Sequence, residues 1–194
     1  MNQEQALQEF KDADALLEGH FKLSSGLHSG IYLQCARVLM DPKRADRLCQ
    51  AFVEKLKRTG VDIDLVVSPA MGGVIVGYEV ARQLGVEGVF TERVNGELEL
   101  RRGFEIPEGS KVLMMEDVIT TGLSSKECIK TINAWGGNVV AAGALINRSG
   151  GKVDVGAPIT ALVTIDAPTY EETALPDALR AIPAIKPGSR NLAK

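Results

Sequence analysis

Several features of common protein classes are missing from this 194-residue sequence. Its three cysteines, Cys35, Cys49 and Cys128, are odd in number and include no CxxC pair. This pattern favours buried, reduced thiols of a cytosolic protein over a disulfide framework or a zinc site. No apolar run approaches the roughly 18 residues of a membrane helix. The polar N-terminus lacks the basic and apolar regions of a signal peptide. We therefore expect a soluble, cytoplasmic protein.

A basic excess is also absent, because 25 Asp and Glu outnumber 22 Lys and Arg and the formal net charge is −3. These totals indicate no nucleic-acid-binding surface. The P-loop signature G-x-x-x-x-G-K-[ST] is missing, and MGGVIVG at 71–77 does not have the G-x-G-x-x-G spacing. The remaining composition, 45% hydrophobic and 24% charged, is ordinary for a globular protein. The length suits one domain with a substantial core.

The first 60 residues predict two helices separated by an extended segment. Apolar residues recur at helical spacing up to Leu17. The segment 21–39 then alternates loosely, as a strand or hairpin would. Asp41-Pro42 predicts the start of the second helix, with the aspartate as N-cap and the proline at the first helical position. This helix should end near Thr59.

From residue 60 onward, short buried strands alternate with helices. This rhythm predicts an α/β domain with a mainly parallel, twisted sheet flanked by helices. The expected strands are 63–69, 87–93, 111–117, 138–148 and 159–166, and the expected helices are 72–85 and 123–137. The charged segment 92–109 interrupts the alternation. Because it is long for a connection within a compact domain, we expect a functional or mobile loop there.

Ligands of open parallel sheets bind beyond the carboxyl ends of the strands. Four places in the sequence lie at such ends, and three of them are unusual in composition. They are 68–73, 92–93, 116–124 and 147–148.

The stretch KVLMMEDVITTGLSS, residues 111–125, combines two of these signals. Thr120, Thr121, Gly122 and Ser124 would lie at a helix N-terminus, where free N–H groups and the helix dipole favour an anion such as phosphate. The preceding carboxylates, at 116–117, would repel a phosphate but suit hydroxyl groups or a divalent cation. The stretch therefore predicts a ligand with a terminal phosphate, a vicinal diol and a metal-bound polyphosphate.

Four hydrophobic residues followed by Glu-Asp, Val-Ile and Thr-Thr-Gly resemble the signature of type I phosphoribosyltransferases, which bind phosphoribosyl pyrophosphate. The resemblance implies one domain spanning 1–194, with an N-terminal hood at about 1–40 and an α/β core at 60–165. It implies that the two acids address the ribose hydroxyls and that 120–124 cradle the 5-phosphate. The implied donor-binding residues are Met71, Gly72, Glu116, Asp117, Val118, Ile119, Thr120, Thr121, Gly122, Leu123 and Ser124.

The segment FKLSSGLHSGIYLQ, residues 21–34, looks like the substrate segment of orotate phosphoribosyltransferases. The resemblance implies that Ser25 and Tyr32 of this segment bind orotate, together with Thr120 and Arg148. Orotate is a planar uracil with a carboxylate, so it needs hydrogen bonds and one cation. A guanidinium at position 148 could hold the carboxylate in bidentate fashion.

SPAMGG at 68–73 matches the pyrophosphate loop of the family. Many relatives carry a basic residue where this chain has Gly72, so its contribution would come from the backbone alone. Arg93 matches the arginine of the family's mobile catalytic loop, but the lysine and histidine that usually follow are missing. We expect Arg101 or Arg102 to neutralise the pyrophosphate instead. The predicted catalytic residues are Arg93 and Asp117, which the resemblance implies, and Arg101 and Arg102, which are our substitutes for the missing lysine and histidine.

The implied reaction is Mg²⁺-dependent transfer of ribose 5-phosphate to orotate in UMP biosynthesis. The Mg²⁺ would be held mainly by the substrate, with help from Glu116 and Asp117. The family also implies a homodimer with shared active sites, and no nucleic-acid or membrane partner is expected. Two alternatives stay open at this point. One is a purine phosphoribosyltransferase, and the other is a regulator that senses phosphoribosyl pyrophosphate.

Overall fold

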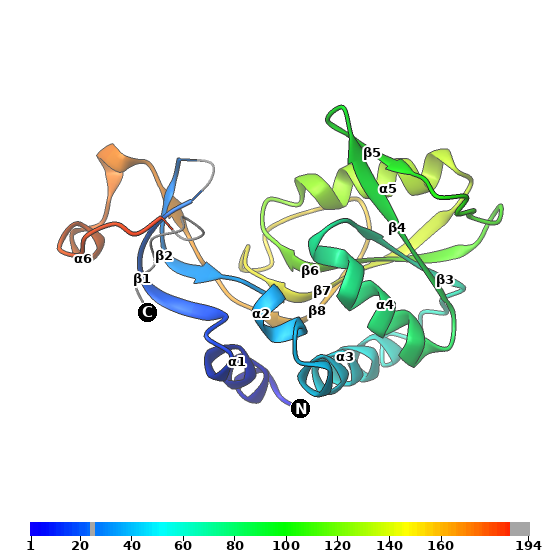
Figure 1. The fold of residues 1–194 in the computed structure, drawn as a ribbon, viewed down its shortest axis with the longest axis horizontal. Helices are drawn as coiled ribbons and strands as arrows, with labels where there is room; N and C mark the ends of the chain where they lie inside the picture. The colour runs from blue at the N-terminus through cyan, green and yellow to red at the C-terminus, as the bar shows by residue number, and fades with distance from the viewer. Residues whose placement is uncertain (24–25, 187–194) are drawn as a thin grey trace.

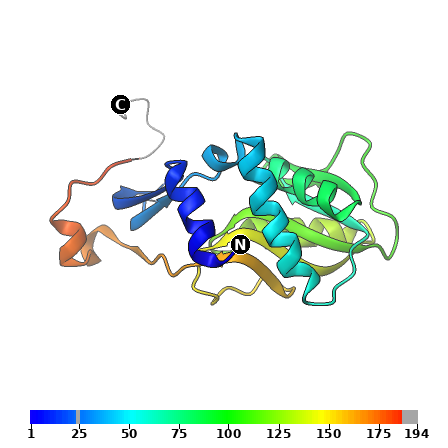
Figure 2. The same ribbon diagram turned by 90° about the horizontal axis from the view of Figure 1, so that it is seen from below.

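Two β-sheets organise the chain (Figure 1). The computed structural model describes residues 1–23 and 26–186. The larger sheet has six strands in the order β5-β4-β3-β6-β7-β8, and the smaller has three in the order β1-β2-β9. Figures 1 and 2 show the smaller sheet to one side of the larger one, with the orange C-terminal segment on its outer side. The predicted α/β architecture is confirmed.

The larger sheet forms the core of the molecule. Its parallel strands are β3 (Leu65–Pro69), β4 (Glu87–Val94), β6 (Lys111–Ile119), β7 (Asn138–Asn147) and β8 (Ile159–Thr164). All five predicted strands exist, with ends that differ by a few residues. The difference that matters is at β6, which runs two residues beyond the predicted end at 117.

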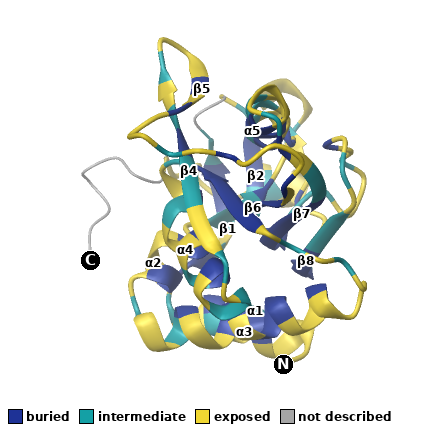
Figure 3. Cartoon of the chain, turned by 90° about the vertical axis from the view of Figure 1, so that its right-hand side faces the viewer, coloured by how far each residue is buried: buried dark blue, intermediate teal, exposed yellow. Residues whose placement is uncertain are grey.

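Helices cover both faces of this sheet. On one face α3 (Pro42–Lys57) and α4 (Gly72–Leu84) share an apolar cluster with Leu113 and Met115 of β6. On the other face α5 (Leu123–Ala134) packs with Val112 and Met114. Successive side chains of a strand point to opposite faces, so the hydrophobic run of β6 serves both clusters. Figure 3 shows this buried layer between exposed helix surfaces.

The segment 92–109 is not a loop throughout, so this expectation is wrong for its first half. β5 (Glu97–Leu100) pairs antiparallel with the end of β4 and forms a hairpin. Asn95 and Gly96 make the turn, with φ of 50° and 94°. Asn-Gly favours such a turn, and ELEL alternates polar and apolar residues as an edge strand does. Only the part after Leu100 connects the hairpin to β6 without regular structure, apart from turns.

The first helix is shorter than predicted. α1 (Gln3–Asp12) begins at a capping box formed by Asn2 and Gln5, and ends before Asp14, whose φ is 48°. Leu17 therefore belongs to the strand β1 (Leu16–Lys22) rather than to the helix. Helical spacing continued to that residue, but pairing with a distant strand outweighed the local pattern.

Chain segments from both ends build the smaller sheet, which we call the hood sheet. β1 and β2 (His28–Leu33) form a hairpin, one of the two forms expected for 21–39, but it starts at Leu16 and residues 36–39 are helical instead. β9 (Thr169–Tyr170) pairs with β2. The chain then passes η1 (Glu172–Ala174) and α6 (Asp177–Arg180) and returns to β1. There, the ring of His20 donates to the Ile182 carbonyl at 2.8 Å, and two backbone hydrogen bonds join β1 to Ile185.

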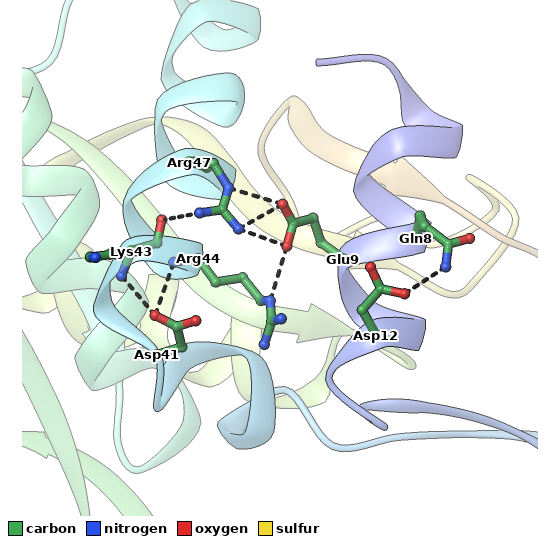
Figure 4. Close-up of polar contacts among 7 residues, drawn as sticks. All are labelled: Gln8, Glu9, Asp12, Asp41, Lys43, Arg44 and Arg47. Carbon is green, nitrogen blue, oxygen red and sulfur yellow. Dashed lines mark hydrogen bonds and ion pairs between the residues drawn. The ribbon is translucent and has the colours of Figure 1, made fainter.

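Helix α3 starts where the sequence predicted. Asp41 accepts hydrogen bonds from the backbone N–H groups of Lys43 and Arg44, and proline occupies the first helical position. The same helix holds α1, because Arg44 and Arg47 both pair with Glu9 (Figure 4). The short α2 (Ala36–Leu39) leads into α3. Within the described residues, no helix combines the length and apolar character needed to span a membrane.

Candidate active site

A pocket of about 540 Å³ lies beyond the carboxyl ends of β6 and β7, at the edge where parallel sheets bind ligands. Three parts of the chain meet there. The core contributes residues after β6 and β7, and the hood sheet contributes the connection between β1 and β2. The segment before β9 closes the third side. The lining residues are Leu23, Leu27, Thr120, Thr121, Arg148, Ser149, Lys152, Asp166, Ala167, Pro168 and Thr169.

The turn before α5 has the form expected of an anion site. Gly122 is the residue before the helix and has φ of 73°, a left-handed conformation that glycine adopts without strain. A Cβ there would come within 2.8 Å of Val153 and Val155. Thr120 and Thr121 are exposed beside it. The glycine therefore lets the chain pass close to its neighbours at a helix start, where the first N–H groups have no partner within the helix and favour an anion.

The adjacent carboxylates of β6 point to opposite faces of the sheet. Glu116 faces α5 and accepts hydrogen bonds from Ser124 at 2.6 Å and from Ser125. Glu116 is buried, with only 5% of its surface exposed. Asp117 faces the start of α4, beside Gly72. Burial raises the pKa of both carboxyl groups, and hydrogen bonds partly oppose the shift in each.

Gly72 leaves the space that Asp117 occupies. A Cβ at this glycine would lie 2.8 Å from one carboxylate oxygen of Asp117 and 2.9 Å from the other. A basic side chain of the kind expected in relatives therefore has no room here without moving the aspartate. Met71, which precedes the glycine, is 85% exposed.

Arg148 lies in the pocket without a carboxylate partner among the described residues. Its guanidinium donates one hydrogen bond, at 3.2 Å, to the hydroxyl of Ser29 in the hood sheet. The pocket's own carboxylate, Asp166, pairs with Lys152 at 2.7 Å instead. Burial lowers the pKa of Arg148, since desolvation disfavours the charged form. A half-buried cation with a single neutral partner is a site for an anionic group.

The three arginines predicted to be catalytic lie on or beside the β4–β5 hairpin and do not line this pocket. Arg93 pairs with Glu127 of α5 and donates to the Gly96 carbonyl. Arg102 pairs with Glu92 at 2.7 Å. Arg101 is exposed. Two of the three are therefore neutralised by neighbouring carboxylates in this conformation.

Two residues of the hood, Ser25 and Tyr32, were predicted to bind the base. Ser25 lies outside the described residues. Tyr32 packs against the ring of Phe21, 5.7 Å between centroids, and is not part of the pocket lining. Leu23 and Leu27 do line the pocket, and sequence reasoning missed both. The available signal was an apolar residue on either side of the Ser-Ser-Gly run.

His28, at the start of β2, is buried in the hood sheet. Its Nδ1 lies 2.6 Å from Nε2 of His20, the residue that is tied to the C-terminal segment. It is not part of the pocket lining.

Comparison with known proteins agrees with this geometry. Residues 39–178 match the phosphoribosyl transferase domain. The orotate phosphoribosyltransferase of Novosphingobium aromaticivorans is 58% identical over 98% of this chain and 98% of its own. The enzyme of the same name from Rhizorhabdus wittichii is 56% identical over 98% of this chain and 97% of its own.

The chain belongs to the orotate phosphoribosyltransferase family. Its fold resembles that of the orotate phosphoribosyltransferase from Aeropyrum pernix, with a TM-score of 0.69 at 24% identity over 81% of this chain and 92% of that one. The resemblance read from residues 111–125 is thus confirmed at the level of the family.

Within the described residues, no cluster of three or more His, Cys, Asp or Glu side chains could enclose a metal ion. Asp117 offers carboxylate oxygens at the strand end, whereas Glu116 points to the opposite face and is held by Ser124 and Ser125. Mg²⁺ is often bound by one or two carboxylates together with substrate phosphates. The residues present fit a Mg²⁺ ion held mainly by the substrate.

Proposed function

We propose that this chain catalyses Mg²⁺-dependent transfer of ribose 5-phosphate from phosphoribosyl pyrophosphate to N1 of orotate, a step of de novo UMP biosynthesis. The products are orotidine 5′-monophosphate and pyrophosphate. All three cysteines are free and buried, which supports a cytoplasmic enzyme.

The observation that carries this proposal is the guanidinium of Arg148, which has no carboxylate partner among the residues that the structure describes. The pocket holds it together with Thr120 and Thr121, which belong to residues 116–125, the stretch that we call the phosphate turn. A base with a carboxylate would give the arginine its missing partner through two parallel hydrogen bonds. A purine base has no such group. Leu23 and Leu27 supply apolar contacts for a planar ring.

The other end of the pocket suits the sugar phosphate. The N–H groups at the start of α5 and the hydroxyls of Thr120 and Thr121 would bind the 5-phosphate. Asp117 would accept hydrogen bonds from the ribose hydroxyls. Glu116 lies one residue earlier and would support the turn through Ser124 and Ser125, with any ribose contact coming second.

In the reaction, N1 of orotate forms a bond to the anomeric carbon as the bond from that carbon to pyrophosphate breaks. Positive charge develops on the ribose ring, and the Asp117 carboxylate would favour it. Mg²⁺, when bound, supplies charge stabilisation to the leaving pyrophosphate. Orotate N1 is acidic, so the chain needs no strong general base.

Arg93, Arg101 and Arg102 would neutralise the pyrophosphate when the hairpin segment moves over the donor. In the present conformation, Arg93 forms an ion pair with Glu127, and Arg102 forms one with Glu92. Closure would thus exchange protein carboxylates for pyrophosphate oxygens. Replacing both Arg101 and Arg102 by glutamate should abolish turnover, and full activity of that variant would show that the assignment is wrong.

We also propose that the enzyme is a homodimer with shared active sites, and that α4 forms part of the interface. Met71, Ile75 and Tyr78 repeat at helical spacing on its outer side and are 85%, 51% and 69% exposed. Such an apolar stripe beside the donor site suits a second copy of the chain. Replacing Ile75 and Tyr78 by aspartate should yield monomers in analytical ultracentrifugation. An unchanged dimer would place the interface elsewhere.

The test of the function is the fall in orotate absorbance on adding phosphoribosyl pyrophosphate and Mg²⁺. The wild-type chain should consume orotate, whereas Arg148→Ala should raise KM for orotate by roughly 100-fold, as expected for loss of a charge-assisted bidentate contact. Lys152→Ala is the matched control, because this pocket lysine already has a carboxylate partner.

No consumption by folded wild-type protein that still binds the donor would contradict the proposal. Activity with adenine or hypoxanthine would then assign a purine substrate. Donor binding without transfer to either base would assign a regulator.

A further inference from the structure

Ser29 joins three separate parts of the pocket, although it does not line it. This β2 residue is fully buried. Its hydroxyl donates to the carbonyl of Pro168 at 3.3 Å, and it accepts from the backbone N–H of Ile31 at 3.3 Å and from the Arg148 guanidinium at 3.2 Å. A hydroxyl has one hydrogen and two lone pairs, so its hydrogen-bonding capacity is filled.

This arrangement fixes the direction of the contact to Arg148. Because the single hydrogen of Ser29 is directed to Pro168, its lone pairs face Ile31 and the guanidinium. The backbone of the arginine is held from the same side, since Ala167 donates to the Arg148 carbonyl at 3.2 Å. The main chain of the 167–168 segment and the hydroxyl thus act on one arginine together.

We propose that Ser29 is the positioning residue for Arg148, and that it sets the preference of the pocket for a carboxylated over an uncarboxylated pyrimidine. This inference rests on the function proposed above. A long arginine side chain has several rotamers, and without this acceptor its guanidinium has no described hydrogen-bond partner. Losing the acceptor should weaken contact with the carboxylate while leaving donor binding intact.

A purely structural role for Ser29 predicts something different. If the hydroxyl only ties β2 to the segment before β9, its loss should loosen the whole pocket. Orotate and a base without a carboxylate would then be affected alike. The distinguishing quantity is therefore the ratio of the KM for orotate to the inhibition constant of uracil. The KM for phosphoribosyl pyrophosphate is a second readout.

The experiment compares Ser29→Ala, Arg148→Ala and the double variant, with Ile31→Val as a control for altered packing in the same strand. We expect Ser29→Ala to raise KM for orotate roughly tenfold, as for one hydrogen bond to a charged group. The inhibition constant of uracil and KM for the donor should not change. In the Arg148→Ala background, the serine substitution should have no further effect.

Equal loss for orotate and uracil, or additive losses in the double variant, would overturn the inference. If Ser29→Ala does not fold, Ser29→Cys keeps a side chain of similar size with a weak acceptor, and the same ratio decides. Failure of the proposed function would look different, because the wild-type chain itself would not consume orotate.

Discussion

The phosphate turn and the base end of the pocket differ in how many chain segments build them. Residues 116–125 supply the carboxylates, the hydroxyls, the glycine and the helix start of the phosphate turn in one uninterrupted stretch. The base end combines the β1–β2 connection, Arg148 and 167–169. A contiguous site can be recognised from its own sequence. An assembled one requires the fold, because no short segment contains it.

Among the single substitutions, the largest effect should come from Asp117, the carboxylate that we propose contacts the ribose. Asp117→Asn removes the charge that favours positive ribose in the transition state, so kcat should fall by about 10²–10³-fold. Glu116→Gln should cost much less turnover, since an amide oxygen still accepts from one of the two serine hydroxyls. Steady-state kinetics of both variants test the difference. Equal losses would mean that the two acids share one role.

A substitution that adds one methyl group at Gly122 should disrupt the phosphate turn itself. Gly122→Ala places a Cβ 2.8 Å from two valines at a φ of 73°, so affinity for phosphoribosyl pyrophosphate should fall by roughly 10-fold or more and stability by about 1–3 kcal/mol. Gly109→Ala is the matched control, with φ of 74° and no atom within 4 Å of the added Cβ. Calorimetry should show the control retaining donor affinity. A comparable loss of donor affinity in both variants would show that backbone strain, rather than contact with the two valines, is responsible.

The base end should be weakened separately by shortening the chain. Ending it after Tyr170 removes the segment whose Ile182 and Ile185 bond to β1. We expect KM for orotate to rise by about 3- to 10-fold, because the hood sheet loses that support, while KM for the donor stays the same. Kinetics with each substrate varied in turn would check this. A rise for the donor alone would contradict the division of the pocket into two ends.

The smallest effect should come from the ion pairs between α1 and α3, outside both ends of the pocket. Glu9→Gln should lower the free energy of unfolding by about 1 kcal/mol without changing either KM. The hydrogen bonds from Arg47 and Arg44 lower the pKa of Glu9 despite the opposing effect of burial. The greater free energy of unfolding of the wild-type chain, relative to Glu9→Gln, should therefore be fully present above pH about 4.5. It should vanish as the pH falls through the lowered pKa of Glu9. Denaturant titrations at pH 7 and pH 3 would measure it, and an advantage that persists in acid would exclude the ion pairs as its source.

The accuracy of the sequence predictions follows this same division. The core strands, α3 with its Asp41 cap and the turn before α5 all depend on local patterns, and each was predicted. Leu17 was assigned to a helix because its pairing partner, Tyr32, is fifteen residues away across a bulged hairpin. Leu23 and Leu27 lie in the predicted substrate segment 21–34 but were not singled out, because the other residues of the pocket come from 148 and 166–169. The link between Ser29 and Arg148 joins residues far apart in the sequence and could not be predicted from it.

The hood sheet ties β1 and β2 to segments near the other end of the described residues, because β9 pairs with β2 and Ile185 bonds to β1. Contacts between residues far apart in the sequence require the closing of a long loop, which costs conformational entropy before the contact stabilises the fold. Gly122, by contrast, lies against Val153 and Val155, which are much closer to it in the sequence. We therefore expect the base end of the pocket to form later during refolding than the phosphate turn.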